Sequence, residues 1–160
     1  MGRVRYITPE GIAAIRAEYD QLFGTERPKV VEIVSWAAGN GDRSENGDYI
    51  YGRKKLREID RRIGYLSKVM KDAKVVDPAT AERRDEVRFG ATVTLVDEDD
   101  RRRVVTLVGD DEADAGAGRV GWSAPIARAI VGARVGDERA VILPSGEMFY
   151  EIEAITYPER

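Results

Sequence analysis

Five apolar residues recur at alternating spacings of three and four over residues 56–70, and this pattern constrains the fold more than any other. They are Leu56, Ile59, Ile63, Leu66 and Met70. Such a heptad pattern is typical of a helix that packs along one seam against another helix. The chain is therefore expected to supply a second long helix as the partner.

The partner helix is predicted in the residues that precede this pattern. Thr8 is a good N-cap, and Pro9 suits the first helical position. Apolar residues then follow at helical spacing: Ile12, Ile15, Tyr19, Leu22, Val30, Ile33, Val34 and Ala37. Pro28 lies inside this pattern and predicts a kink or one broken turn. Because Gly39-Asn40-Gly41 ends the segment, we expect an antiparallel hairpin over residues 1–78, with arms of about 45 Å at about 1.5 Å per residue.

The apolar period changes to two after Asp77-Pro78, which stops the second helix. Alternation over 87–95 predicts a strand that ends at an acidic turn over 97–100. Four more strands are predicted at 104–108, 119–122, 139–143 and 148–157, and a two-turn helix at 125–132. Several strands around one short helix indicate a small α+β domain over residues 79–160.

The composition excludes several kinds of chemistry. The 160 residues include no cysteine and no histidine, which removes disulfides, cysteine nucleophiles, structural zinc and any Ser-His or Cys-His relay. No signal peptide or membrane span is evident, so we expect a soluble, cytoplasmic protein. Residues 1–76 carry a net charge of +4 and residues 77–160 a net charge of −7, which fits two units with different surroundings as well as ordinary solvated faces.

The hairpin turn carries two carboxylates that are candidate catalytic and metal-binding groups. Asp42 and Glu45 are three residues apart at the predicted start of the second helix, so both can face the same way. The spacing fits a capping box, which is the commoner use of this pattern, and it also fits a pair of oxygen ligands for Mg²⁺. Two carboxylates cannot complete the near-octahedral shell of Mg²⁺. A metal site at this tip would therefore need further ligands from a partner.

A row of basic residues follows the second helix at helical spacing, offset from its apolar seam. The basic stripe comprises Arg53, Lys54, Arg57, Arg61, Lys68 and Lys71. Residues 53–74 hold nine Lys and Arg against three Asp and Glu. Such a stripe is usually a solvated helix face, but next to a tip that carries carboxylates it also fits a surface that follows a nucleic-acid backbone.

Taken together, these features resemble the bacterial Gre transcript-cleavage factors, and within that family GreB more than GreA. The most specific match is Gly41-Asp42-Arg43-Ser44-Glu45-Asn46 with Asp48-Tyr49, joined to a long hairpin. The resemblance covers almost the whole chain, with further motifs at Tyr6–Gly11, Glu26–Pro28, Ser35–Ala38, Leu56–Arg62, Pro125–Ala129, Val135–Asp137 and Pro144–Glu147. Arg43-Ser44 and Trp36 are the features that favour GreB.

The resemblance implies an antiparallel coiled coil followed by an FKBP-like α+β domain that docks on RNA polymerase. In this family the globular domain binds the rim of the secondary channel, and the hairpin reaches the active centre. By resemblance, Asp42 and Glu45 help to hold a second Mg²⁺, shared with the polymerase, and the attacking water. The polymerase itself then hydrolyses backtracked RNA. The factor is thus expected to be an activator rather than an enzyme, and to bind no metal when free.

The resemblance also implies roles for other residues. The residues expected to shape the tip are Arg43, Ser44, Asn46, Asp48 and Tyr49. The residues expected to dock on the polymerase are Ser123, Pro125, Ala127 and Arg128. The basic stripe would contact the 3′ end of the RNA. No membrane and no small-molecule substrate are expected. The chain departs from the family at Ala124, where Ser is usual, and in a turn rich in glycine at Gly39, Gly41 and Gly47.

Three other functions are open to this sequence. The first is a Gre-like channel binder that inhibits the polymerase, against which the intact Asp42 and Glu45 argue. The second is an FKBP-type prolyl isomerase or chaperone, but the large rings of residues 80–158 do not indicate the aromatic pocket that it needs. Those rings are Phe89, Trp122, Phe149, Tyr150 and Tyr157. The third is a free-standing nucleic-acid binder that uses the basic stripe, which the net charge of −3 disfavours.

Overall fold

The computed structural model describes residues 4–40 and 46–160, and its contacts divide the chain into two compact units. One unit is Ile12–Asp72, and the other combines Met1–Gly11 with Ala73–Arg160. The sequence analysis instead placed one boundary after residue 78. The difference arises because strand β1 (Tyr6–Ile7) pairs in parallel with β2 (Lys74–Val75), a contact that the short apolar pattern of β1 does not predict.

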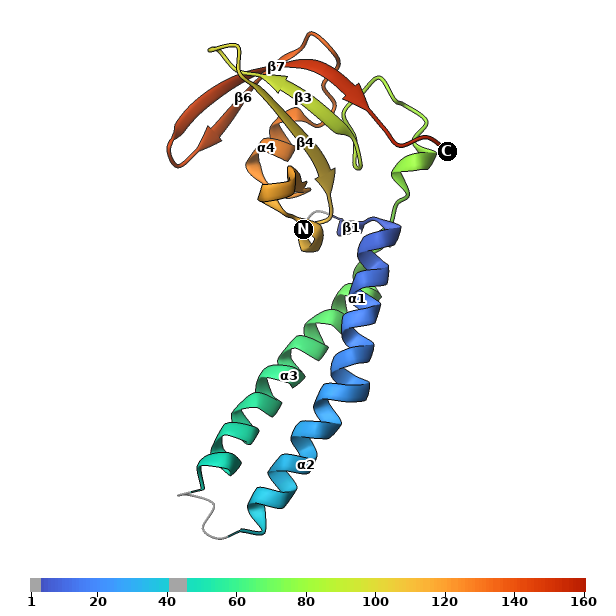
Figure 1. Ribbon diagram of the computed structural model, residues 1–160. Helices are drawn as coiled ribbons and strands as arrows, with labels where there is room; N and C mark the ends of the chain where they lie inside the picture. Colours follow the sequence, from blue (N-terminus) through green and yellow to red (C-terminus); the bar gives the residue numbers. More distant parts are fainter. Residues whose placement is uncertain (1–3, 41–45) are drawn as a thin grey trace. The chain divides into compact units, whose positions relative to one another are not determined.

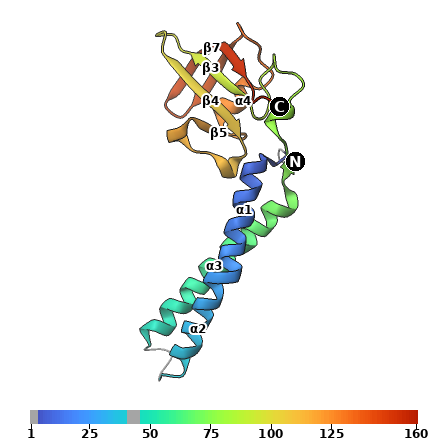
Figure 2. The same ribbon diagram turned by 45° about the vertical axis from the view of Figure 1, so that its right-hand side comes forward.

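The unit Ile12–Asp72 is an antiparallel helical hairpin, as predicted. Helices α1 (Pro9–Gln21) and α2 (Arg27–Ala38) form the first arm, and α3 (Gly47–Asp72) forms the second. In both views α2 and α3 lie side by side (Figures 1 and 2). Of the predicted seam, Ile59 and Leu66 are buried and the other members are partly buried. The heptad pattern therefore identified the packed face of α3 correctly.

The first arm changes its helical geometry just before Pro28. A π-helical turn, η1 (Leu22–Glu26), joins α1 to α2, and the N–H of Arg27 bonds to the carbonyl oxygen of Leu22, five residues earlier. Proline lacks an N–H, and its ring crowds the carbonyl four residues before it. A wider turn at this point relieves that crowding without ending the helix. The predicted irregularity is confirmed, and its form is a π turn.

The other unit contains a curled five-stranded sheet in the order β5-β4-β3-β7-β6. Its strands are β3 (Thr92–Val96), β4 (Arg102–Val108), β5 (Arg119–Gly121), β6 (Glu138–Leu143) and β7 (Gly146–Thr156). Neighbouring strands are antiparallel except for β4 and β5, which are parallel and lie next to each other in Figure 2. Helix α4 (Pro125–Ile130) packs against one face of the sheet, and this packing forms the core (Figure 1).

The predicted strand over 87–95 is only partly formed. Strand β3 begins at Thr92, whereas Val87 and Phe89 are buried within a loop. The loop turns at Gly90, whose φ of 88° lies in the left-handed region. The alternation of apolar and polar residues over 87–91 therefore arises because this loop packs on the core, and not because it pairs as a strand. Three short 3-10 turns, η2 (Pro78–Thr80), η3 (Asp110–Glu112) and η4 (Ala115–Ala117), complete the unit.

No helix in residues 4–40 and 46–160 has the length and apolar character that crossing a membrane requires.

Candidate functional site

The structure describes the two flanks of the candidate tip, which end at residue 40 and resume at residue 46. Asp42, Arg43, Ser44 and Glu45 lie outside the described residues. On one side the first arm ends with α2 at Ala38, and on the other α3 begins at Gly47. The structure therefore shows how the chain on either side of the two predicted catalytic carboxylates is held.

Asn46 fixes the start of α3. Its side-chain Oδ1 accepts a hydrogen bond of 3.2 Å from the backbone N–H of Tyr49, which is the N3 position of the helix. Its side-chain Nδ2 donates a hydrogen bond of 2.6 Å to the carbonyl oxygen of Ala37, near the end of α2. One side chain thus caps α3 and joins the two arms. The described start of α3 is capped by Asn46, whereas the Asp42–Glu45 pair of the capping-box interpretation lies outside the described residues.

The first turn of α3 carries two more residues that the sequence analysis placed at the tip. Asp48 is exposed in this turn, where the partial positive charge at the start of a helix favours a carboxylate. Tyr49 is half-buried, and its hydroxyl accepts a hydrogen bond of 3.4 Å from Nη1 of Arg53. The guanidinium of Arg53 also lies 5.9 Å from the centre of the Tyr49 ring. Tyr49 therefore holds Arg53, the first member of the basic stripe, close to the tip.

The basic stripe forms one exposed face of α3. At about 100° per residue, its six members lie about 100–200° around the helix from Gly52, which is buried against Val34 of α2. Within the described part of the chain, none of Lys54, Arg57, Arg61, Lys68 and Lys71 forms an ion pair. The predicted stripe is thus an uncompensated positive surface on one side of the helix.

Other charged residues of the hairpin serve to join its arms. Arg62 pairs with Glu18 at 2.5 Å, and the hydrogen bond from Arg62 holds the pKa of Glu18 below its ordinary value. Arg27 pairs with Asp60 at 2.8 Å, and the hydrogen bond to Asp60 raises the pKa of Arg27. Some charged residues of α3 therefore form ion pairs with the first arm, whereas the basic residues of the stripe do not.

Apolar residues near the tip are less buried than their spacing predicted. Ile33 belongs to the predicted apolar pattern but is 51% exposed, because α2 uses Val30, Val34 and Ala37 on its packed face. Trp36, which the sequence analysis singled out, is 65% exposed.

The four predicted docking residues do not share one environment. Pro125 and Arg128 are exposed on α4, and the N–H of Ser123 bonds to a carboxylate oxygen of Asp110 at 2.8 Å. Ala127, however, is 0% exposed in the core, so the prediction that it contacts a partner is not compatible with its burial. Ala124 occupies the N-cap of α4 and makes no side-chain cap.

Three aromatic rings come together in the globular unit, one of which the sequence analysis missed. The ring centroids of Tyr6, Phe89 and Trp122 are 5.4–5.6 Å apart, in tilted and edge-to-face arrangements. They border a hollow of about 680 Å³ that Lys74, Arg83 and Arg88 also line. Because the rings pack on one another and the rim is charged, the cluster serves to anchor β1 rather than to form an open apolar pocket for proline. Tyr6 was missed because nothing in its local pattern indicates this long-range contact.

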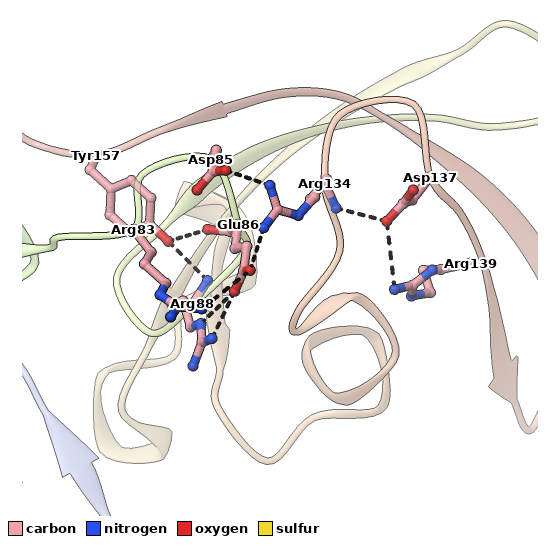
Figure 3. Close-up of polar contacts among 8 residues, drawn as sticks. All are labelled: Arg83, Asp85, Glu86, Arg88, Arg134, Asp137, Arg139 and Tyr157. Carbon is pink, nitrogen blue, oxygen red and sulfur yellow. Dashed lines mark hydrogen bonds and ion pairs between the residues drawn. The ribbon is translucent and has the colours of Figure 1, made fainter.

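A charged cluster around Glu86 has a structural role (Figure 3). The Glu86 carboxylate is 11% exposed and accepts hydrogen bonds from Arg88 at 2.7 Å and from Arg134 at 2.8 Å. The bond from Arg88, followed by the positive charges of Arg88 and Arg134, holds the pKa of Glu86 below its ordinary value. Burial raises the pKa of the Tyr157 hydroxyl, which donates to the backbone oxygen of Glu86. The cluster ties three separate loops of this unit together.

The two predicted metal ligands, Asp42 and Glu45, lie outside the described residues. Among residues 4–40 and 46–160, no three carboxylates gather closely enough to hold a metal ion. Asp42 and Glu45 offer the hard oxygen ligands that Mg²⁺ prefers, but two such ligands leave most of its shell unfilled. A magnesium site at these two residues therefore stays a prediction from the sequence, and it would need further ligands from a partner.

Both parts of the chain match models of known transcription elongation factors. The family model "Transcription elongation factor, N-terminal" matches residues 5–75, and "Transcription elongation factor, GreA/GreB, C-term" matches residues 81–157. Similar relatives include "Transcription elongation factor GreB" of Neisseria meningitidis serogroup B, 50% identical over 152 residues, covering 95% of this chain and 93% of the relative. The protein of the same name from Yersinia pestis is 45% identical over 157 residues, covering 98% and 91%.

The solved structures to which the chain is matched include the GreA factor homolog Gfh1 of Thermus thermophilus. It is 20% identical, with a TM-score of 0.45, covering 96% of this chain and 99% of that one. A GreA/GreB factor from Nitrosomonas europaea is 27% identical, with a TM-score of 0.42, covering 59% and 79%.

Proposed function

Because the chain belongs to the GreA/GreB family of transcription elongation factors, we propose that it acts on RNA polymerase as a transcript-cleavage factor of the GreB type. One structural observation of this chain supports the proposal in addition to its family membership. The sequence Asp42-Arg43-Ser44-Glu45 immediately precedes Asn46, whose side chain both caps α3 and bonds to α2. The two carboxylates are thus attached to an anchored helix start, and an anchored start favours the positional accuracy that such catalysis needs.

The proposed chemistry assigns Asp42 and Glu45 to a magnesium site completed by the polymerase. A bound Mg²⁺ would supply charge neutralisation at the scissile phosphate and a more acidic bound water. Asp42 and Glu45 would provide two of the oxygen ligands and orient the water by accepting its hydrogen bonds. Asp48 adds negative charge in the first turn of α3 without being assigned as a ligand. No histidine is needed for this chemistry, in agreement with the composition.

The basic stripe is proposed to hold the RNA whose 3′ end has left the active centre. Its members line one face of α3, and none of the six forms an ion pair within the described residues, so their charges are available to meet phosphates. Arg53, held by Tyr49, is the member nearest in sequence to the tip. The contact should be mainly electrostatic and should weaken as the salt concentration rises.

The globular unit is proposed to dock on the polymerase at the rim of its secondary channel, with Ser123, Pro125 and Arg128 as contact residues. The exposure of Pro125 at the start of α4 and of Arg128 in its last turn supports this part of the proposal. The packing of a single helix on a curled sheet supports an FKBP-like description of the unit. The ring cluster of Tyr6, Phe89 and Trp122 does not favour a second function in prolyl isomerisation.

The proposal is tested with RNA polymerase complexes that have been stalled and allowed to backtrack. Addition of the full chain with Mg²⁺ should shorten the RNA and leave a new 3′ end that the polymerase can extend. Replacement of Arg57 and Arg61 by Glu should raise the factor concentration needed for cleavage more strongly for long extruded RNA than for short. If the wild-type chain bound the complex and produced no shortened RNA, the cleavage role would be wrong and an inhibitory role would replace it.

A further inference from the structure

The sheet of the globular unit has a second face that the helix of this unit, α4, does not cover. Helix α4 lies on one face only (Figure 1). In an antiparallel ladder, residues directly opposite each other point to the same face. Ala140 and Phe149 are such a pair between β6 and β7, and both are exposed. Their neighbours Val141 and Tyr150 are buried on the core side. We name the uncovered side the outer face.

The outer face exposes large apolar side chains at the β6–β7 end of the sheet. Ile142 is 77% exposed and Phe149 is 47% exposed. Ile142 lies two residues from Ala140 along β6, so it shares the outer face with Phe149. Val96 of β3 pairs with Glu151 of β7 and extends the same surface. Neighbouring exposed apolar residues of this size on a soluble protein indicate an interaction surface.

A hollow of about 310 Å³ lies at the end of β3, where it adjoins the outer face, and its charged lining residues have one sign of charge. It is lined by Val96, Asp97, Glu98, Asp100, Glu138, Phe149, Tyr150 and Glu151. Five of these residues are carboxylates, and none is Lys or Arg. The turn that carries three of them is held in place because Oδ1 of Asp97 accepts hydrogen bonds from the N–H groups of Asp99 and Arg101. The hollow thus combines apolar walls with a fixed acidic rim.

We propose that the outer face is a second contact with RNA polymerase, and that the hollow receives a Lys or Arg side chain that a polymerase segment presents beside an apolar residue. The inference rests on the proposed function, because it takes the polymerase as the partner. The methylene stem of Lys or Arg packs on the Phe149 ring, and the cationic group meets Glu138 and Glu151. Ile142 packs against the neighbouring apolar residue of the same segment. This contact is separate from the docking residues Ser123 and Pro125, which lie at the start of α4.

The test measures the affinity of the full chain for purified core RNA polymerase by fluorescence anisotropy, at low and at moderate salt. The double variant Ile142→Thr with Phe149→Thr keeps residues suited to a strand while it removes the apolar surface. It should raise Kd about tenfold, a loss typical of removing central apolar contacts. The double variant Glu138→Gln with Glu151→Gln changes charge alone. It should slow association and make the affinity less dependent on salt.

The control is Val104→Thr, which changes another exposed apolar residue of the same sheet on β4, two strands away from β7. It should leave Kd within twofold of the wild type. If both double variants folded and bound as tightly as the control, the second contact would be excluded while the proposed function stood. If the wild type itself failed to bind, the proposed function would fail first. Dimers in which the basic stripe of one copy occupies the outer face of another, detected by light scattering, would also overturn the inference.

Discussion

The side chain of Asn46 donates a hydrogen bond of 2.6 Å to the backbone oxygen of Ala37, so that the start of α3 is joined to the end of α2. The same side chain accepts from the N–H of Tyr49. The two bonds act at different helices, and a carboxamide is the group that can donate to one and accept from the other. This one amide therefore joins the two described flanks of the tip.

Replacement of Asn46 by Ala should lower the free energy of unfolding of the hairpin by about 1–2 kcal/mol, because the cap and the link between the arms are both lost. Replacement by Asp keeps the acceptor for the N–H of Tyr49 and loses the donor to Ala37, so its cost should be intermediate. Urea unfolding followed by the helical circular dichroism signal measures both. Equal stability of the Ala variant and the wild type would show that the amide does not hold the tip.

Two glycines of α3 should respond in opposite ways to alanine. A Cβ at Gly52 would lie 2.7 Å from Cγ2 of Val34, so Gly52→Ala should destabilise the hairpin by about 1–3 kcal/mol through overpacking. A Cβ at Gly64 would meet nothing within 4 Å, so Gly64→Ala should stabilise it by about 1 kcal/mol through helix propensity. Adding Val34→Ala to Gly52→Ala should recover part of the loss. Thermal unfolding of the three variants checks the close approach of α2 and α3, and a stabilised Gly52→Ala would contradict it.

The start of α4 should gain stability from a hydroxyl group. Ala124 has the extended backbone of an N-cap, with φ −66° and ψ 150°, but its side chain makes no cap. Ala124→Ser should therefore raise the free energy of unfolding of the globular unit by about 0.5–2 kcal/mol. Chemical unfolding followed by Trp122 fluorescence measures the change. An unchanged or lower stability would mean that the N–H groups at this helix start are already satisfied by another partner.

The Glu86 cluster should make the stability of the globular unit sensitive to acid. Because Arg88 and Arg134 lower the pKa of Glu86 in the folded state, its contribution is present above its ordinary value of 4.5 and is lost as the pH falls through the folded value. Glu86→Gln should destabilise the unit at pH 7 and flatten the decline of its unfolding midpoint below about pH 4.5. Glu82→Gln, which changes an exposed carboxylate of the same segment, is the control. Parallel pH profiles for Glu86→Gln and the wild type would contradict this assignment.

The sequence predicted those parts of the fold that depend on local periodicity. The apolar spacing of Leu56, Ile59 and Leu66 identified the packed face of α3, and the Pro125–Gly132 pattern identified α4. The pairing of β1 with β2 was not predictable, because it joins residues that lie far apart in the chain and have no distinctive pattern. The prediction of a strand at Val87 and Phe89 was wrong, because a loop that packs on the core shows the same alternation of apolar and polar residues as a strand.

The candidate site was predictable to a different extent in each part. The basic stripe follows from helical spacing alone, and the structure places all six members on one exposed face. Asn46 was assigned to the tip, but its link to Ala37 depends on where two arms meet, which no spacing rule gives. Ala127 was carried over from a motif and proved to be buried, because half of a short helix on a sheet must face the core.

The most direct measurement is the cleavage of RNA in backtracked polymerase complexes by Asp42→Asn and Glu45→Gln, at factor concentrations shown to saturate binding. Glu32→Gln, an exposed carboxylate of α2, is the matched control. Each tip variant should bind the complex as the wild type does and lose cleavage by at least a hundredfold, a factor equivalent to about 2.7 kcal/mol of barrier, while the control retains cleavage. Wild-type cleavage by Asp42→Asn and Glu45→Gln would contradict the account.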